Sequence, residues 1–319
     1  MSSGPLGGWS DLEPLRLVEI WGDPGEVPVR TVADFLGDAL SGAARAYLAR
    51  DTARSRAGNE EDLHQARVSL RRIRSYLRTF RSVVDPIWAS AVRAELGWFG
   101  GLLGEVRNLD VMAGRISRRE DNGDDLAGYK ELLAAAEVER AAALTDVAQA
   151  RELPRYQSVR SYVDALANRE VRFGVGASEE AATATARILR RPWRAVRDAA
   201  KTARRAPTET NLHVLRIRSK ELRYAAEISR EFYGVPASRL ARAAQGVQDR
   251  LGEHRDALST AEFAHRAAME HPSCAYAAGQ FVVMERLAAE RSLEGLGGDL
   301  RRLRSVWRDF ERSSANRKG

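Results

Sequence analysis

One basic helix motif occurs twice in this chain, and its repetition constrains the fold more than any other feature of the sequence. In the first copy, His64 is followed by Arg67, Arg71, Arg74 and Arg78. At about 100° per residue, these side chains lie within an arc of roughly 80° on one face of a helix. Apolar residues occupy the other positions. The segment therefore predicts a helix with one basic face and one face that a core can bury.

The second copy stands 149 residues later. His213, Arg216, Lys220 and Arg223 repeat the offsets 0, 3, 7 and 10 that the first copy shows. Two positions depart from the first copy, because Glu221 and Glu227 stand where Arg72 and Arg78 would be repeated. We therefore expect the second basic stripe to be weaker than the first.

The residues around the two motifs repeat as well. Asn59 and Thr208 each precede their histidine by five residues, where an N-cap side chain accepts a free backbone N–H. Pro86 and Pro236 follow the histidines by 22 and 23 residues. Because proline cannot continue a helix, we expect each of them to end its motif helix.

A further segment, Leu-Gly-Glu-x-Arg followed by Asn or Asp, begins 39 and 38 residues after the two histidines. We expect Gly104 and Gly252 to form tight turns between helices, and Arg107 and Arg255 to start the helices that follow. The two arginines are either ligands of a bound group or helix caps. Landmarks in one order at nearly constant spacing indicate an internal duplication with an offset of about 149 residues.

These motifs resemble the CHAD family, the conserved-histidine α-helical domain. The resemblance rests on the His-x-x-Arg-Val/Ile-x-x-Arg/Lys helix and the Leu-Gly-Glu-x-Arg-Asn/Asp segment, and it covers about residues 30–312. It implies an all-α chain of two four-helix-bundle halves related by a pseudo-two-fold. It also implies a basic surface that binds inorganic polyphosphate.

Composition agrees with an all-α chain, since strand-forming residues are sparse and Ala, Leu, Arg and Glu dominate. The sequence predicts a flexible N-terminal arm over residues 1–28, a first half over 30–173 and a second half over 178–312. The best boundary is the Gly-rich segment 174–178. Helices are also expected from Thr31 to about Asp51 and from Leu126 to Arg151.

The net charge of +7 is carried almost entirely by arginine, since only four of the 51 basic residues are lysine. Arginine presents a planar fork of donors that fits phosphate oxygens. The alternative is that the arginine content reflects a GC-rich genome and salt-bridged helix faces. The two repeated stripes are harder to explain in that way, because both stripes carry mostly one sign of charge.

If the two halves pack about a pseudo-two-fold, the two stripes line one basic cleft. A run of like charges in a cleft repels itself, so a polyanion is the natural partner of the two stripes. The alternative is an internal salt-bridge network, in which Glu105, Asp110, Glu253 and Asp256 would supply the acids; these acids could also orient the arginines. The predicted polyphosphate contacts are His64, Arg67, Arg71, Arg74, Arg78, Arg107, His213, Arg216, Lys220, Arg223 and Arg255.

The sequence does not decide whether the two histidines have a structural role or a binding role. A neutral histidine can donate one hydrogen bond to phosphate, and a protonated one adds charge. If they bind, the affinity for polyphosphate rises as the pH falls through the histidine pKa.

Enzyme signatures are absent from the sequence, and no cofactor or metal is expected. There is no Walker-type phosphate loop, and no carboxylate pair at metal-binding spacing recurs between the halves. His254, His265 and His271 lack cysteine partners for a zinc site. CHAD domains often stand beside a CYTH triphosphatase domain. The nearest match to its Glu-x-Glu-x-Lys motif is the segment 137–140, in an alanine-rich helix, so we expect a free-standing CHAD protein.

The leading prediction is non-catalytic binding of polyphosphate, with a role as a scaffold at polyphosphate granules or in targeting to them. One alternative is a nucleic-acid-binding helical protein, although aromatic residues do not interleave with the stripes. The other is a polyphosphate-processing phosphatase. A cytoplasmic location is expected, since Cys274 is the single cysteine and no stretch approaches 18 apolar residues for a membrane span.

Overall fold

The protein is built from α-helices. The computed structural model describes residues 30–51, 59–120 and 126–316, and within these ranges the regular elements are helical, apart from two isolated β-bridges. The all-α prediction is therefore confirmed. The predicted flexible arm at residues 1–28 lies outside the described residues.

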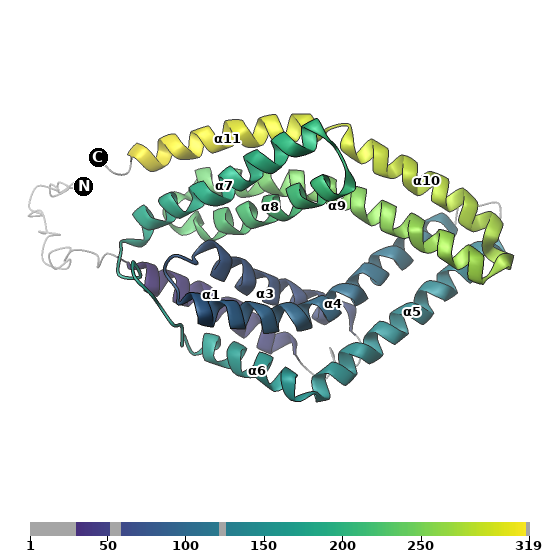
Figure 1. Cartoon of the computed structure of the whole chain (residues 1–319), viewed down its shortest axis with the longest axis horizontal. Coiled ribbons are helices and arrows are strands. Elements are labelled where there is room, and N and C mark those ends of the chain that lie inside the picture. The colour runs from purple at the N-terminus through teal and green to yellow at the C-terminus, as the bar shows by residue number, and fades with distance from the viewer. Residues whose placement is uncertain (1–29, 52–58, 121–125, 317–319) are drawn as a thin grey trace, which may run out of the picture.

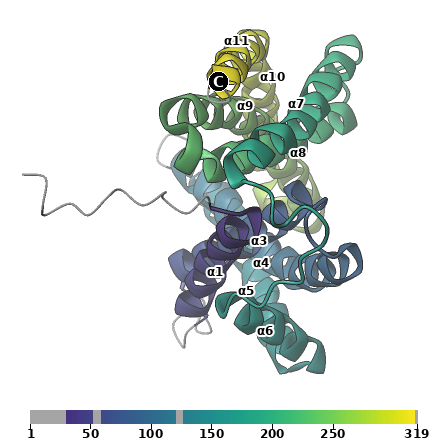
Figure 2. The same ribbon diagram turned by 90° about the vertical axis from the view of Figure 1, so that its left-hand side faces the viewer.

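The helices from the first part of the chain lie on one side of the molecule, and those from the second part lie on the other (Figures 1 and 2). The first side contains α1 (Val32–Arg50), α3 (Glu60–Thr79), α4 (Pro86–Glu120), α5 (Leu126–Glu152) and α6 (Pro154–Ala167). The bounds of α1 and α5 agree closely with the predicted helices.

The second side begins with α7 (Ala181–Arg205) and α8 (Glu209–Ile228), followed by the long helix α9 (Arg230–Glu270). A short 3₁₀ helix, η1 (Pro272–Cys274), then leads into α10 (Ala275–Leu293), and α11 (Leu296–Asn316) ends the described chain. In Figure 1 the long helices α4, α5, α9 and α10 converge at the end of the molecule opposite the start of α1 and the end of α11.

The predicted N-caps of both motif helices are confirmed. The Asn59 side chain accepts a hydrogen bond from the backbone N–H of Asp62 at 2.9 Å, and α3 begins one residue after Asn59. The Thr208 hydroxyl accepts one from the backbone N–H of Asn211 at 3.3 Å at the start of α8. The caps fix where each motif helix starts and therefore which side chains share its basic face.

The prediction that Pro86 and Pro236 end the motif helices is wrong. α3 ends at Thr79, and Pro86 is the first residue of α4, where its missing N–H has no intrahelical partner to lose. α8 ends at Ile228, and Pro236 lies inside α9, two residues after Gly234, whose φ of 44° interrupts the helical path. Each proline therefore stands near the start of a helical segment.

The predicted turns at Gly104 and Gly252 are also wrong, because both residues lie inside the long helices α4 and α9. A Cβ atom at Gly104 would lie 3.4 Å from Nε of Arg67, and one at Gly252 would lie 3.7 Å from Nε of Arg216. The glycines thus allow the arginines of the motif helices to approach closely, which requires no break in the helix.

Two apolar clusters form the interior. The larger one joins α1 and α3–α6 to the end of α9 and to α10, and the rings of Tyr129 in α5 and Phe281 in α10 lie 6.1 Å apart within it. The smaller one joins α7, α8, the first part of α9 and α11, with Leu215 and Trp307 among its members. Because α10 packs into the larger cluster, helices from both predicted halves share one core. The division at residues 174–178 stays a prediction.

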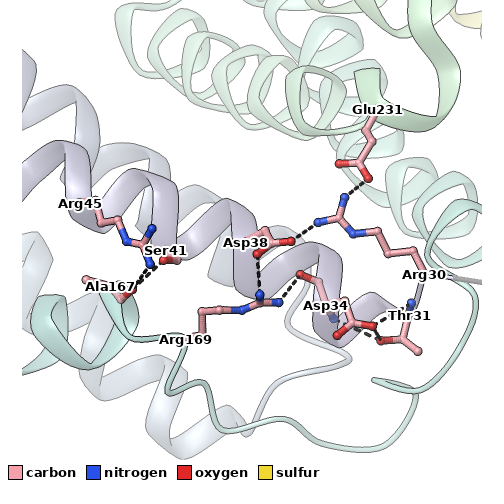
Figure 3. Close-up of polar contacts among 9 residues, drawn as sticks. All are labelled: Arg30, Thr31, Asp34, Asp38, Ser41, Arg45, Ala167, Arg169 and Glu231. Atoms are coloured by element: carbon pink, nitrogen blue, oxygen red, sulfur yellow. Dashed lines mark hydrogen bonds and ion pairs between the residues drawn. The ribbon is translucent and has the colours of Figure 1, made fainter. Parts of the chain in front are cut away.

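A polar network around the start of α1 connects the two sides (Figure 3). Arg30, just before α1, forms ion pairs with Asp38 of α1 and with Glu231 of α9. Arg169, which follows α6, forms a 3.0 Å ion pair with Asp38 as well. These contacts anchor α1 against α9. Since α3 packs on α1 and α8 packs on α9, they also help to keep the two motif helices in register.

Candidate functional site

The two basic stripes come together in the folded protein, because helices α3 and α8 pack against each other. Between them and α4 lies a pocket of about 330 Å³. We call it the central pocket. Its lining residues are Arg67, Arg71, Arg74, Ser75, Arg78, Arg93, Gly100, Ile217, Lys220, Glu221 and Tyr224.

Lys220 is the residue whose charge is most strongly disfavoured in this pocket. Burial, together with the charges of Arg216, Arg71, Arg67 and Arg223, lowers its pKa from 10.5 to about 6. Burial also lowers the pKa of Arg67 to about 10, with contributions from Arg71 and Arg216. The charges of Arg67 and Arg71 on α3 act on Lys220 of α8, and the charge of Arg216 on α8 acts on Arg67, so the two stripes face each other.

Five of the predicted arginine and lysine contacts have no ion pair among the described residues: Arg67, Arg71, Arg74, Arg216 and Lys220. The Nε atoms of Arg71, Arg74 and Arg216 are also buried without a hydrogen-bond partner. Unpaired buried charge destabilises a folded protein, so these groups are poised to gain from an anionic ligand. An internal salt-bridge network does not account for them.

The acids expected for such a network are engaged elsewhere. Asp110 pairs with Arg140 at 2.7 Å, and Glu253 pairs with Arg115 at 2.7 Å. Glu105 accepts a 3.4 Å hydrogen bond from the Asn108 side chain. None of them forms an ion pair with either stripe among the described residues.

Asp256 is the one acid of that set that lies near a stripe. Its charge favours the protonated form of Arg216, although the two form no ion pair. Burial raises the pKa of the Asp256 carboxyl, and Arg216 opposes that shift. Asp256 therefore offsets part of the positive charge at one end of the second stripe.

Both histidines are half-buried, and each has a buried Nδ1 atom without a hydrogen-bond partner. Burial lowers the pKa of His64, with a further contribution from Arg107, and it lowers the pKa of His213, with a further contribution from Arg255. Both shifts favour the neutral form of the ring. The two histidines do not line the central pocket but stand at the first turns of the two stripes.

Arg107 and Arg255 occupy equivalent places in the two repeats. Arg107 lies 2.8 Å from Glu60 in the first turn of α3, and Arg255 lies 3.8 Å from Glu209 in the first turn of α8. Neither starts a helix, because α4 and α9 run through them without interruption. They bring positive charge beside the histidines, and neither lines the central pocket.

Arginines at the far end of the stripes are paired with acids. Glu221 forms ion pairs with Arg78 and, at 2.9 Å, with Arg218. Arg223 pairs with Glu227 at 2.8 Å. Glu221 and Glu227, which stand where the first copy of the motif has arginines, therefore neutralise Arg78 and Arg223. The basic groups that have no acidic partner lie around Arg71 and Lys220.

Several pocket residues were not predicted from the sequence. Arg93 of α4 lines the central pocket, and a smaller adjoining pocket adds Arg191 of α7 and Arg218 of α8. The adjoining pocket shares Arg78 and Glu221 with the central one. Arg93 and Arg191 lie on helices without a His motif, so only their position in space connects them to the site.

Tyr224 is the aromatic residue of the central pocket. Its ring lies 5.6 Å from the guanidinium carbon of Arg71 and 4.8 Å from that of Arg223. Its ring is 1% exposed, and its hydroxyl is buried without a hydrogen-bond partner. The ring supports two arginines through cation–π contact and leaves no face for a stacked base.

The described residues contain no group of three His, Cys, Asp or Glu side chains that could hold a metal ion. The His254 ring nitrogen Nδ1 lies 3.0 Å from the backbone oxygen of Ala289. The segment 137–140 is part of helix α5, where Glu139 pairs with Arg266 and Arg140 pairs with Asp110. It is helix surface, as predicted.

Comparison with known proteins places this arrangement in a family. The family model of the CHAD domain matches residues 38–265. This chain belongs to the CHAD family. CHAD domains are associated with polyphosphate binding in general, and no CYTH domain is evident in this chain.

Two solved structures share the fold. PptA from Streptomyces chartreusis has a TM-score of 0.69 and 22% identity, covering 85% of this chain and 100% of that one. The crystal structure of the CHAD domain from the plant Ricinus communis has a TM-score of 0.69 and 22% identity, covering 86% and 92%. At this identity the likeness concerns the fold alone.

Curated sequence relatives come from Mycobacterium tuberculosis. The uncharacterized protein MT2285 and the uncharacterized protein Rv2226 are each 29% identical over 304 residues, which is 88% of this chain. The chain spans about half the length of these relatives, 55% in each case. Among the described residues of this CHAD protein, none of the helices has the length and hydropathy needed to cross a membrane.

Proposed function

We propose that this CHAD protein binds inorganic polyphosphate in the central pocket without catalysing its conversion. The observation that carries the proposal is the set of uncompensated basic groups on α3 and α8, above all Lys220, whose pKa is lowered to about 6. A polyanion supplies the missing negative charge to Arg67, Arg71, Arg74, Arg216 and Lys220 together.

A linear phosphate chain fits this pocket better than a nucleic acid. The lining arginines approach from α3 and α4, while Lys220 comes from α8, so positive groups surround the ligand from several helices. Single-stranded nucleic acid gains much of its affinity from bases stacked on aromatic rings. Tyr224 is too deeply buried to offer such a face.

The non-catalytic assignment rests on the chemistry of the lining residues. Lys220, the arginines and Ser75 can hold and orient phosphate oxygens, and Glu221, the lining acid, is already paired with Arg78 and Arg218. Phosphatase activity is the competing proposal. It predicts that added Mg²⁺ or Mn²⁺ releases free phosphate from polyphosphate, whereas simple binding predicts no release.

We also propose that the two motif helices descend from an internal duplication that gave two four-helix-bundle halves. Two pairs of equivalent features support this proposal. They are the N-caps at Asn59 and Thr208, and the glycines at 104 and 252 that leave space for arginines of the motif helices. In the same proposal, polyphosphate binding recruits the protein to cytoplasmic polyphosphate granules. A fluorescent fusion should then colocalise with granules and lose that localisation when the central pocket is mutated.

The experiment that tests the binding proposal is a competition titration against labelled long-chain polyphosphate at fixed salt. Unlabelled polyphosphate, single-stranded DNA, duplex DNA and ATP are the competitors, tested on wild type and on an Arg71→Ala/Lys220→Ala variant. We expect polyphosphate to compete best and the variant to lose most of its affinity.

The matched control is a Lys130→Ala/Arg239→Ala variant, which removes the same charge at two exposed positions outside every described pocket. It should bind nearly as wild type does. Equal competition by DNA, or equal losses in the two variants, would show that the stripes act only as generic positive charge.

A further inference from the structure

A second basic groove lies along α7, where this helix packs on α11. It consists of two adjoining pockets of about 580 and 420 Å³ that share Arg197 and Arg304. We call it the outer groove. Its eight basic lining residues are Arg190, Arg194, Arg197, Lys201, Arg204, Arg301, Arg304 and Arg308, and Asp198 and Glu311 are the acids among its lining residues.

Helix α7 concentrates positive charge to an unusual degree. It carries eight basic side chains and one acid, Asp198. Its net charge of +7 equals the formal net charge of the whole chain, so the remaining residues sum to zero. Asp198 is paired with Arg197 at 3.0 Å. The other seven basic residues of the outer groove form no ion pair among the described residues.

The groove is built on a rigid base. The rings of Trp193 in α7 and Trp307 in α11 are stacked, with centroids 4.9 Å apart and an interplanar angle of 9°. Trp307 is 2% exposed, so this pair joins the helices and is not a platform for bases. The basic side chains of both helices are exposed above it. Two facing rows of unpaired charge repel each other unless an anion lies between them.

The outer groove and the central pocket are connected through α7 itself. Arg191 lines the small pocket that adjoins the central pocket beside Arg78 and Glu221. Its neighbour Arg190, together with Arg194, lines the outer groove. Exposed arginines on successive turns of one helix therefore form a basic path from one site to the other.

We propose that the outer groove is a second polyphosphate-binding site, which a long chain held in the central pocket reaches by crossing α7. The inference rests on the proposed function of the central pocket. It makes affinity depend on chain length, because a chain that occupies both sites gains the second set of contacts at a high effective concentration. A chain too short to cross α7 gains nothing from the second site while it occupies the first.

The test compares the binding of long-chain polyphosphate, tripolyphosphate and single-stranded DNA to three variants over a range of salt. A Lys201→Ala/Arg304→Ala variant removes one basic residue from each wall of the outer groove, and both positions are exposed, so the fold should be retained. The Arg71→Ala/Lys220→Ala variant reports on the central pocket. The Lys130→Ala/Arg239→Ala variant controls for net charge.

For the outer-groove variant we expect the affinity for long chains at low salt to fall about tenfold. We also expect the slope of log affinity against log salt to flatten by about 1.4, since each lost phosphate contact of a single strand contributes about 0.7. Tripolyphosphate affinity should change by no more than about twofold, and the charge control should resemble wild type for both ligands.

Three results would overturn the proposal. One is an unchanged long-chain affinity in the outer-groove variant; another is an equal loss in the charge control. The third is a selective loss of single-stranded DNA binding, which would assign the groove to nucleic acid. Failure of the proposed function gives a different pattern, in which the central-pocket variant binds long chains as wild type does.

Discussion

A Cβ atom on Gly97 of α4 would lie 3.0 Å from a terminal guanidinium nitrogen of Arg74 on α3. Because glycine has no Cβ, the guanidinium of this pocket arginine, which has no ion pair among the described residues, can lie against α4. The same relationship recurs at Gly104 with Arg67 and at Gly252 with Arg216. Glycines of the long helices thus leave the space that these arginine side chains occupy.

The first prediction concerns the space that Gly97 leaves for the Arg74 side chain. In a Gly97→Ala variant the new methyl group should push the Arg74 guanidinium aside and lower the affinity for polyphosphate several-fold. Gly101→Ala on the same helix is the matched control, because a Cβ there meets no atom within 4 Å. The control should keep its affinity and gain up to about 1 kcal/mol in the free energy of unfolding, from better helix propensity. Equal affinities in the two variants would contradict the account.

Replacement of Lys220 by an apolar residue should separate stability from binding. Lys220, among four arginines, gives up its proton on folding at pH 7, which costs free energy. Lys220→Met removes that cost, so the free energy of unfolding without ligand should rise by about 1 kcal/mol or more at pH 7. Affinity for polyphosphate should fall at the same time. Urea unfolding and a binding titration measure the two effects, and a less stable variant would argue against a disfavoured charge at this position.

The pH dependence of stability follows from the same residue. The pKa of Lys220 is about 6 in the folded protein and about 10.5 in the unfolded chain, so between these values the unfolded state binds more protons. The Lys220 contribution to the free energy of unfolding therefore increases as the pH rises from 6 toward 10. Comparison of wild type with Lys220→Met at pH 6 and pH 9 isolates it. The stability difference between the two proteins should shrink at the higher pH.

Binding should show the opposite trend. Polyphosphate favours the charged form of Lys220, so complex formation takes up a proton above pH 6, and affinity falls as the pH rises through that value. The lowered pKa values of His64 and His213 act in the same direction at lower pH. A Lys220→Arg variant, which stays charged, should have a flatter profile between pH 6 and 8. If the affinity of the Lys220→Arg variant falls with pH as steeply as that of wild type, the proton taken up on binding belongs to another group.

Arg115 supports the contact between the two sides of the molecule. It is 8% exposed on α4 and bonds to Glu285 of α10 and Glu253 of α9, each at 2.7 Å. Arg115→Ala leaves the buried Glu285 carboxylate without its partner, so the free energy of unfolding should drop by about 3–5 kcal/mol. The exposed Arg302→Ala change on α11 should stay within about 0.5 kcal/mol. A similar result for both in urea unfolding would contradict the assigned role.

The sequence alone was sufficient for the starts of the two motif helices and for their basic stripes, because caps and periodicity are local signals. It failed at Gly104, Gly252 and Pro236, where a local preference for turns gave way to packing between helices. It also missed Arg93 and Arg191, which belong to the site only through their neighbours in space. The ion pair between Glu221 and Arg78 could not be derived from the pattern, because the two residues stand 143 positions apart in the chain.

The most direct test of the central claim is the titration of the Lys220 amine by nitrogen-detected NMR, with and without polyphosphate. The chain has only four lysines, so the signal can be assigned by its loss in the Lys220→Arg variant. The account predicts a pKa of about 6 in the free protein and a rise by several pH units when polyphosphate binds. An ordinary lysine pKa in the free protein, or a low one that polyphosphate leaves unchanged, would contradict it.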